Sequence, residues 1–555
     1  MTLRKVSEPS HSGLRAGGRD WPVWLPPALL TLVATLAGIG HAQLWRDELA
    51  TWSAATRPVG DLVRLAGTID AATGPYYLFV HGWTAVFGTS PTALRLPSAL
   101  AVTAAAALTA RLGERLAGPR AGLLAGLLLA VVPSTSRYGQ EARPYALATL
   151  LAVLATLLLV EALRRPSWPR WTGYALTVAA LGLTHLIALT LLAAHGLVVL
   201  LTTRRGPIPV GLDDPPPSAA TGSGPAPSRR ALPDPAEPDP TPPDPAPPGP
   251  VPPDATGLHA APHDSAPPGP PAGRAGRLPG RWLVALLPAV LLVTPLVLVA
   301  RGQRSRQLDW VDPARLPDLA ALPGGAAQSG VVGGFLVGLA ALGAARLGRR
   351  ALLPGACVLL PVLLLFVTAT RVPLWVNRYL VFTVPFACLL AGAALAAVRL
   401  VPALAVLTLA GLLGLPDQTA LRRTHEWPRS APVDYAGVAR IIAAHRQPGD
   451  AIVYSPRDSW LFLDLGMAYH LGSDRPRDVL LARDQRQRAD LWASECDRPA
   501  QCLAGARRVW LVVAGRHADP LTAVPGAKGT ALRATYTVDE TWPRPGLTLA
   551  LLTPR

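Results

Sequence analysis

The chain has 555 residues, of which 50% are hydrophobic and only 16% are charged, and its mean hydropathy is +0.30. A soluble globular protein carries about a quarter charged residues, so this composition excludes an ordinary soluble enzyme. The net charge of +17 does not indicate a nucleic-acid partner, because the arginines cluster beside long uncharged blocks. Several such blocks in series also exclude a single cleaved signal peptide.

Eleven apolar segments approach or reach the roughly 20 residues that a helix needs to cross the hydrocarbon core. With the basic N-terminal tail 1–21 in the cytoplasm, counting the segments in order places every arginine cluster in a cytoplasmic loop. We therefore predict a polytopic α-helical protein of the cell membrane, with about eleven transmembrane helices. The predicted helices are 22–41, 92–110, 121–134, 144–163, 171–184, 186–203, 281–300, 329–346, 351–369, 378–398 and 401–415. The arginine clusters are Arg111/Arg115/Arg120, Arg164/Arg165/Arg170, Arg204/Arg205 and Arg346/Arg349/Arg350.

A proline-rich segment separates the N-terminal helices (22–205) from the C-terminal helices (281–415). Residues 206–280 contain 25 of the 60 prolines, interspersed with Ala, Gly, Ser and Asp. Such a segment cannot bury enough apolar surface to offset the entropy of ordering it, which predicts a disordered cytoplasmic linker. A proline-rich docking site is the alternative interpretation.

Residues 416–555 are predicted to form a small extracytoplasmic α/β domain. A helical face around 438–445 is followed by a Gly–Asp turn and a short apolar strand. The predicted strands are 451–454, 509–513 and 547–552. Because no phosphate-binding glycine loop accompanies them, we assign this domain an accessory role.

Two of the four cysteines, Cys496 and Cys502, lie close together in this domain. In an extracytoplasmic compartment they are expected to form a disulfide, with two unpaired thiols as the alternative. No CxxC or Cys/His spacing typical of a metal site occurs.

The first outer loop, 42–91, begins with HAQLWRDELATWSAA and carries the adjacent acids Asp47 and Glu48. The apolar residues of this stretch fall on one helical face, which predicts a helix lying in the membrane interface. That face consists of Trp45, Leu49 and Trp52. The two acids sit beside it, just above the membrane. Solvated acids that pair with Arg46 are the alternative to a catalytic role.

Two later loops bring further charged residues to the same side of the membrane. The segment SRYGQEARPYALATLL places Glu141 near a helix N-terminus, where a carboxylate is favoured by the dipole even without a catalytic role. The segment TRVPLWVNRYLVF contains Arg371 and Arg378, which interrupt an apolar region. An arginine in such a place needs an anionic partner, and a lipid phosphate is the natural one. Snorkelling interfacial arginines are the alternative.

In order and spacing, these motifs resemble the GT-C glycosyltransferases, specifically the group of protein O-mannosyltransferases and aminoarabinose transferases, over roughly residues 20–400. The resemblance rests on Asp47–Glu48, GPYYLFVHGW (74–83), LRLPSAL (94–100), YGQEARPYAL (138–147), THL (184–186) and NRYLVFTVPF (377–386). In that family the donor is a polyprenyl-phosphate sugar, and the aspartate of the first loop is the catalytic base. A second acid lies in a later outer loop. The resemblance therefore implies catalytic roles for Asp47 and Glu141.

Other residues of these motifs are expected to bind the substrates. The residues expected at the donor phosphate are Arg371, Arg378 and Tyr379. Those expected to contact the rest of the substrates are Glu48, His81, Arg143, Tyr145 and His185. No metal site and no obligatory cofactor are expected, because arginines can stabilise a monophosphate leaving group. A divalent cation held by Glu141 and Glu48 is the alternative.

The predicted function is an inverting transfer of a mannose- or arabinose-type sugar from a polyprenyl-phosphate donor to an acceptor hydroxyl on the outer face of the membrane. Such a transfer needs one carboxylate to take the hydroxyl proton and cations to stabilise the departing phosphate. The expected partners are the donor, membrane lipids and a protein, lipid or glycan acceptor, with no nucleic acid. A polytopic transporter or lipid flippase is the main alternative, and a catalytically inactive scaffold is a third. Convergence of Asp47, Glu141 and Arg378 on one outer cavity favours the enzyme.

Overall fold

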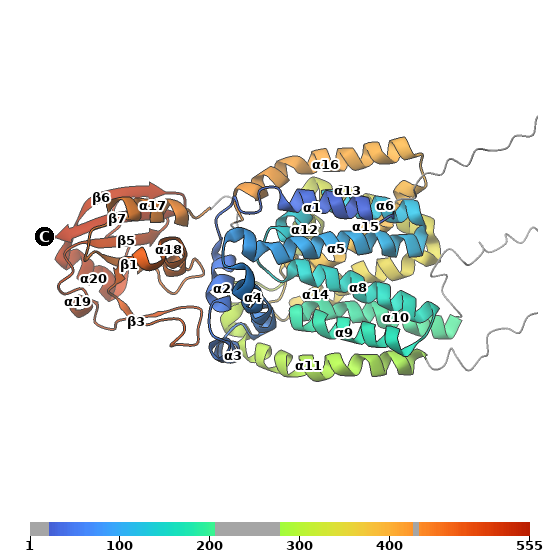
Figure 1. Cartoon of the computed structure of the whole chain (residues 1–555), viewed down its shortest axis with the longest axis horizontal. Coiled ribbons are helices and arrows are strands. Elements are labelled where there is room, and N and C mark those ends of the chain that lie inside the picture. The colour runs from blue at the N-terminus through green and yellow to red at the C-terminus, as the bar shows by residue number, and fades with distance from the viewer. Residues whose placement is uncertain (1–21, 206–277, 426–431) are drawn as a thin grey trace, which may run out of the picture.

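The computed structural model describes residues 22–205, 278–425 and 432–555. The predicted N-terminal tail and residues 206–277 of the predicted linker lie outside the described residues. Long helices form a bundle, and the C-terminal domain lies at one end of it (Figure 1). The predicted fold class, a polytopic helical protein with a small C-terminal α/β domain, is confirmed.

Each of the eleven predicted segments coincides with a helix of the bundle. Several helices begin with proline at the first position, where the missing N–H costs nothing. The bundle helices of the N-terminal half are α1 (Leu25–Leu36), α5 (Pro91–Ala117), α6 (Pro119–Val131), α7 (Pro133–Gly139), α8 (Tyr145–Arg164), α9 (Trp168–Thr184) and α10 (Leu191–Arg205). Those of the C-terminal half are α11 (Leu278–Gln307), α12 (Leu316–Ala327), α13 (Gly330–Leu347), α14 (Leu352–Ala369), α15 (Val384–Ala396) and α16 (Leu400–Arg423).

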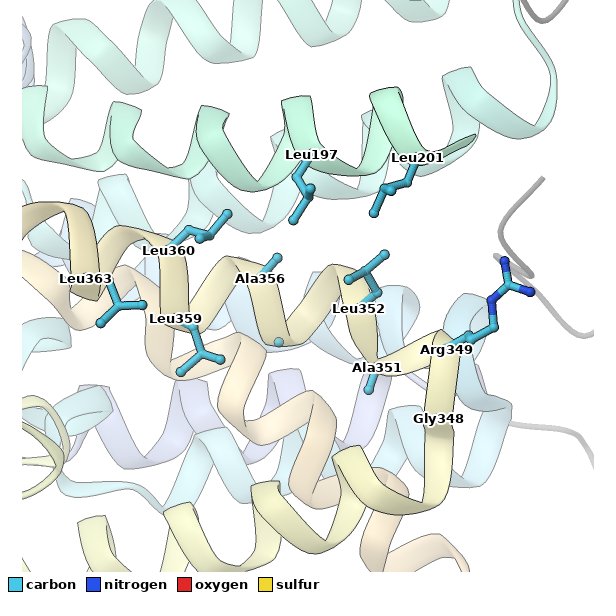
Figure 2. A pocket seen from close by; sticks show the side chains of 11 residues that line it. Leu197, Leu201, Gly348, Arg349, Ala351, Leu352, Ala356, Leu359, Leu360 and Leu363 are labelled. Carbon is cyan, nitrogen blue, oxygen red and sulfur yellow. The ribbon is translucent and has the colours of Figure 1, made fainter. Parts of the chain in front are cut away.

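Among the described residues, seven helical stretches are long and apolar enough to cross a membrane, or eight if the bent pair α6–α7 forms one span. One of the seven, 330–369, contains both α13 and α14, and the chain turns between them at Gly348 (Figure 2). Two further helices are shorter: α1 has 12 residues and α9 has 17. The predicted count of about eleven therefore includes segments that do not meet this criterion individually.

The long helices run alternately toward one end of the bundle and back, with the bent pair α6–α7 counted as one pass (Figure 1). The turns that carry the arginine clusters consequently lie at one end, and α2 (Arg46–Ala55), α3 (Val59–Thr68) and α4 (Gly74–Phe87) lie at the other, beside the C-terminal domain. The other end is not free of arginine, because Arg304 and Arg306 lie in the last turn of α11 and Arg306 pairs there with Asp490 at 3.0 Å. We refer to the end that carries α2–α4 as the domain-side end.

The C-terminal domain is built on a five-stranded sheet of order β2-β1-β5-β7-β6. In this order the first three strands, β2, β1 and β5, run parallel to one another. The strand β7 runs antiparallel to both of its neighbours, β5 and β6. The strands are β2 (Arg477–Asp478), β1 (Ala451–Ser455), β5 (Val509–Ala514), β7 (Leu547–Pro554) and β6 (Tyr536–Arg544). Cys496 and Cys502 form a disulfide, as predicted. The helix α16 extends eight residues beyond the predicted end at 415, so the domain begins later, with α17 (Tyr435–His445).

The C-terminal domain packs directly on the first loop of the bundle. Leu49 on α2 is fully buried in a cluster that includes Leu465 of α18 (Leu463–Leu471). Trp52 packs edge-on against Tyr469, with ring centroids 5.2 Å apart. The prediction that this helix lies in the membrane interface is therefore wrong in one respect, because the apolar face of α2 is covered by protein rather than by lipid.

An apolar groove of about 610 Å³ lies between α10 and α14 (Figure 2). Leucines such as Leu197 and Leu360 line it, and Arg349 lies at its rim beside the turn at Gly348. This turn belongs to the arginine-rich end of the bundle. The groove is thus remote from the first loop and its acids.

Candidate functional site

Asp47 lies in the first turn of α2, where the helix dipole favours a carboxylate. Its Oδ2 atom is 3.5 Å from Nη1 of Arg378 and 3.9 Å from Nε of Arg143. The side chain is 16% exposed, and within the described part of the chain this buried Oδ2 has no hydrogen-bond donor. Asp47 is therefore held by charge between two guanidinium groups and keeps an oxygen free for another donor.

Glu48 points in a different direction and is completely buried. Arg95 of α5 donates two hydrogen bonds to it, Nε to Oε1 at 2.8 Å and Nη2 to Oε2 at 2.6 Å. The backbone N–H of Ala142 donates a third, at 2.9 Å. Burial alone would raise the pKa of Glu48, but the ion pair with Arg95 outweighs burial and holds this pKa well below its ordinary value.

The predicted contact between Glu48 and substrate is not supported by this geometry. The carboxylate ties α2 to α5 and to the loop that carries Glu141. Because Arg95 occupies both of its oxygens, Glu48 is not available to hold a divalent cation together with Glu141. Within the described ranges, no group of three or more His, Cys, Asp or Glu side chains gathers in a way that could hold a metal ion.

A cavity of about 270 Å³ lies at the domain-side end of the bundle. Its polar walls include the cations Arg137 and Arg378 and the acids Glu141 and Asp318. Three indole rings complete much of the wall, and they belong to Trp45, Trp310 and Trp375. Aromatic walls with a few convergent charged groups are typical of a site for a small polar ligand.

Several buried polar atoms around this cavity have no partner among the described residues. The orphaned donors are Nη1 of Arg137, Nε of Arg378 and Nε1 of Trp45 and Trp375, and the orphaned acceptors are both carboxylate oxygens of Glu141. Buried polar groups in folded proteins are nearly always hydrogen-bonded, and each exception needs an explanation. A ligand that offers both an anionic group and hydroxyl groups would satisfy donors and acceptors together.

Glu141 lies in the loop between α7 and α8 and is 1% exposed. Burial raises the pKa of its carboxyl, and the nearby charges of Glu48 and Asp47 act in the same direction. Arg137, whose Nη2 is 3.6 Å from Oε1, opposes this increase only in part. A carboxyl with a raised pKa in a cavity is a typical feature of a functional site.

The predicted aromatic residues gather beside Arg378. The rings of Tyr145, His185 and Tyr379 contact one another, with centroids 5.5 to 6.3 Å apart. The Arg378 guanidinium lies 6.0 Å from the Tyr145 ring and 5.6 Å from the Trp310 ring. These rings fix the position of the guanidinium by cation–π contact.

Two predicted binding residues are not brought to this place. The Nδ1 atom of His81 lies 2.8 Å from the carbonyl oxygen of Ala55, a contact that joins α4 to α2, and His81 does not line the cavity. Arg371 is exposed and is also absent from the cavity wall. Of the two arginines in that loop, the structure places only Arg378 beside Asp47 and in the cavity.

Several residues of the site were not predicted from the sequence. Arg137 lies within the quoted segment SRYGQEARPYALATLL but was given no role there. It lies 3.6 Å from Glu141, and its guanidinium is 5.0 Å from the centroid of the Trp45 ring. Trp45 was assigned to a lipid-facing surface, yet it is 1% exposed and lines the cavity. Trp310 and Trp375 come from loops that only the three-dimensional fold brings together. Of these residues, only Arg137 could have been identified from the sequence, because it interrupts an apolar segment as Arg378 does.

Comparisons with known proteins concern the fold and the class of the chain rather than its individual site residues. Residues 75–209 match the family model of the dolichyl-phosphate-mannose-protein mannosyltransferases. No curated protein matches the chain. Among solved structures, the chain resembles ArnT from Cupriavidus metallidurans in the apo state, with 13% identity and a TM-score of 0.54. It also resembles the same protein bound to undecaprenyl phosphate, with 13% identity and a TM-score of 0.53. Each alignment covers 95% of this chain and 97% of the other.

The match to the family model confirms the predicted resemblance to GT-C glycosyltransferases, and the two structures share the fold of this chain. Together they support the predicted class, a membrane glycosyltransferase. The matched segment contains Glu141 and Arg143 but neither Asp47 nor Arg378. The roles of individual site residues therefore depend on the geometry described above.

Proposed function

We propose that the chain transfers a mannose- or arabinose-type sugar from a polyprenyl-phosphate donor to an acceptor hydroxyl at the domain-side end of the bundle. The observation that supports this proposal most directly is the ion pair between Asp47 and Arg378. Arg378 also lines the cavity whose wall includes Glu141. One guanidinium thus connects the candidate base with the candidate donor site. The ArnT structure bound to undecaprenyl phosphate supports a polyprenyl-phosphate donor for this fold.

The donor headgroup is assigned to the cavity. Its phosphate is placed on Arg378 and Arg137, since guanidinium groups bind phosphate through paired hydrogen bonds. Its sugar is placed against the indole rings, with hydroxyl groups donating to the orphaned oxygens of Glu141. In this placement the polar groups of the cavity wall form hydrogen bonds with both the phosphate and the sugar hydroxyl groups of one donor molecule.

The proposed reaction is a single inverting displacement. The acceptor oxygen forms a bond to the anomeric carbon as the bond from that carbon to the phosphate oxygen breaks. The hydroxyl proton passes to Oδ2 of Asp47, and the polyprenyl phosphate leaves with the electron pair of the broken bond. Arg378 stabilises the negative charge that develops on this leaving group. Once the phosphate has taken Arg378 as its partner, Asp47 is held less tightly and can accept the proton.

The proposal requires no metal, because the two arginines supply positive charge at the leaving group. We also propose that the domain-side end faces the extracytoplasmic side, as the positions of the arginine clusters suggest. A nucleotide-sugar pool is lacking there, so an activated sugar must arrive on a lipid.

A transporter or flippase is the main rival. It would place charged residues near the middle of the bilayer, along a path that opens to both sides. The cavity is instead lined by residues from helix ends and loops on one side, among them Glu141 and Trp375. This position favours the enzyme.

The proposal is tested with purified chain in lipid nanodiscs. Polyprenyl-phosphate mannose and polyprenyl-phosphate arabinose, each labelled in the sugar, are offered with a mixture of hydroxyl acceptors. We expect release of polyprenyl phosphate from at least one donor and no turnover of GDP-mannose, which is the matched control donor. Turnover of the nucleotide sugar, or bilayer translocation of the lipid donor without cleavage, would contradict the proposal.

A further inference from the structure

The groove between α10 and α14 takes no part in the proposed transfer, and its walls are apolar. Leu197 and Leu201 line it from α10, and Leu360 lines it from α14 (Figure 2). Two further lining residues, Leu359 and Leu363, are 59% and 47% exposed. The groove is therefore open to the surroundings of the bundle, and in a membrane-spanning protein those surroundings are lipid tails.

The wall formed by α14 includes Gly355, which lies in the interior of that helix. A glycine inside a membrane helix commonly lets a neighbouring helix approach closely. Gly122 of α6 is such a case, because a Cβ atom added there would lie 2.2 Å from the carbonyl oxygen of Ala110. A Cβ atom added at Gly355 would have no neighbouring atom within 4 Å. The space beside Gly355 is consequently part of the groove and is not filled by protein.

The rim of the groove carries a cation, Arg349. The chain turns there at Gly348, whose φ of 54° and ψ of −123° suit glycine far better than other residues. Arg349 is exposed, and within residues 22–205, 278–425 and 432–555 no carboxylate forms an ion pair with it. Its guanidinium can therefore bind an external anion, and a phosphate group matches its geometry well.

The depth of the groove corresponds to one leaflet of a bilayer. Its lining on α14 runs from Leu352 to Leu363, which is about 16 Å at ~1.5 Å per residue. Half of the hydrocarbon core is about 15 Å thick. The lining stops before α14 ends at Ala369, so the groove does not reach the domain-side end. One acyl chain that enters from the arginine-rich end would fill this depth.

We propose that the groove binds one anionic phospholipid, with an acyl chain along its leucines and the headgroup phosphate on Arg349. Basic pockets between membrane helices at the cytoplasmic side commonly bind anionic headgroups. This lipid is neither donor nor acceptor, so the inference goes beyond the proposed function. A polyprenyl phosphate has similar chemistry, but the donor phosphate is assigned to Arg378, at the opposite end of the bundle.

The headgroup contact is tested by native mass spectrometry of the full chain in detergent. Dioleoyl phosphatidylglycerol and dioleoyl phosphatidylcholine, which have the same acyl chains, are added in equal amounts. We expect one phosphatidylglycerol to be retained per chain, with a preference of roughly fivefold, the effect of one arginine near a membrane surface. Arg349→Gln should abolish this preference. Arg371→Gln is the matched control, because Arg371 is also exposed but does not line the groove.

The acyl-chain contact is tested separately with Gly355→Leu, which places a side chain in the groove without meeting protein. Leucine favours the helix more than glycine does, so this variant should fold. We expect it to weaken lipid retention by roughly tenfold, as expected when a well-fitted site is overfilled. Gly338→Leu is the matched control, because Gly338 of α13 also has open space beside it but does not line the groove. It should retain lipid within about twofold of the wild type.

Three results would overturn the inference. The first is equal retention of the two lipids by the wild-type chain, and the second is unchanged retention in both Arg349→Gln and Gly355→Leu. The third is a dimer that Gly355→Leu dissociates while no lipid is retained, which would make the groove a contact between two copies. Displacement of phosphatidylglycerol by equimolar polyprenyl phosphate would likewise assign the groove to a polyprenyl chain. None of these measurements depends on sugar transfer, so a failure of the proposed function would be seen separately.

Discussion

Arg378 approaches Asp47 to 3.5 Å, although the two residues come from opposite halves of the chain. Helix α2 supplies the carboxylate from the first loop, and the segment η5 (Asn377–Thr383) supplies the guanidinium just before α15. Arg378 also lines the cavity. This contact therefore joins the two chemical requirements of the proposed transfer, a proton acceptor and a cation at the leaving group.

Replacing Arg378 should primarily impair use of the donor. Arg378→Ala removes a charge-assisted hydrogen bond of about 1.5–3 kcal/mol, which corresponds to a tenfold to hundredfold increase in donor KM. Arg378→Lys should recover part of this loss, because lysine keeps the charge but not the paired geometry. Steady-state kinetics with varied donor measure both effects. Arg371→Ala is the matched control, since Arg371 is exposed and away from the cavity. Equal losses in Arg371→Ala and Arg378→Ala would refute this assignment.

Glu48→Gln should destabilise the fold. It leaves the guanidinium of Arg95 buried without a counter-charge, and breaking such a pair typically costs about 3–5 kcal/mol. Thermal unfolding in detergent should show a clearly lower Tm, and the double variant Glu48→Gln/Arg95→Met should recover part of it. Because the folded-state pKa of Glu48 is held below its ordinary value, this stabilisation is present at neutral pH. It is lost as pH falls through the folded-state pKa. A Tm that is unchanged in Glu48→Gln at pH 7 would be inconsistent with the buried pair.

Glu141→Gln should have the opposite effect on stability. The folded-state pKa of Glu141 is raised by burial, so the folded chain binds this proton more tightly than the unfolded chain does. The ionised carboxyl consequently lowers stability as pH rises from the ordinary pKa through the raised one. We expect Glu141→Gln to have a higher Tm than the wild type at pH 8, and the difference to shrink toward pH 4. A difference that grows as pH falls would show that the sign of the shift is wrong.

Transfer by Glu141→Gln is a separate readout. The amide keeps one acceptor but replaces the other oxygen with a donor, so sugar hydroxyl groups lose one of the two orphaned oxygens. We expect a higher donor KM together with the higher Tm. A stable variant with unchanged donor KM would place Glu141 outside the donor site.

The helices were largely predictable from sequence, whereas their contacts were not. Long uncharged runs identify bundle helices locally, so all eleven segments correspond to observed helices. The helices α4 and α12 were missed, because they lie in segments assigned to outer loops. Asp47, Glu141 and Arg378 were found because charged residues beside apolar blocks are conspicuous.

The rest of the site depends on packing between distant segments. The partner of Glu48 is Arg95, which lies within the quoted motif LRLPSAL. Nothing in the sequence indicates that these two residues form an ion pair. Trp45 appeared to face lipid because the docking of the C-terminal domain could not be predicted from periodicity.

The orientation in the membrane is tested by cysteine labelling in intact cells. Cys357 and Cys388 are buried and Cys496 is bonded to Cys502, so background labelling of the native protein should be low. A membrane-impermeant maleimide should label Ser473→Cys, which is exposed in the C-terminal domain. It should not label Ser223→Cys, in the predicted cytoplasmic linker outside the described residues. The reverse pattern would place the cavity on the cytoplasmic side.

The central claim is tested most directly by transfer from a polyprenyl-phosphate sugar in Asp47→Asn, compared with the wild type at equal amounts of folded protein. The substitution keeps the shape of the side chain and removes its capacity to accept a proton. Loss of a positioned general base typically lowers the rate by roughly 10²–10⁴, so we expect kcat to fall by that factor. The donor KM should change little. Near-normal transfer by Asp47→Asn, with Glu141→Gln inactive, would assign the base to Glu141. Near-normal transfer by both variants would contradict the mechanism.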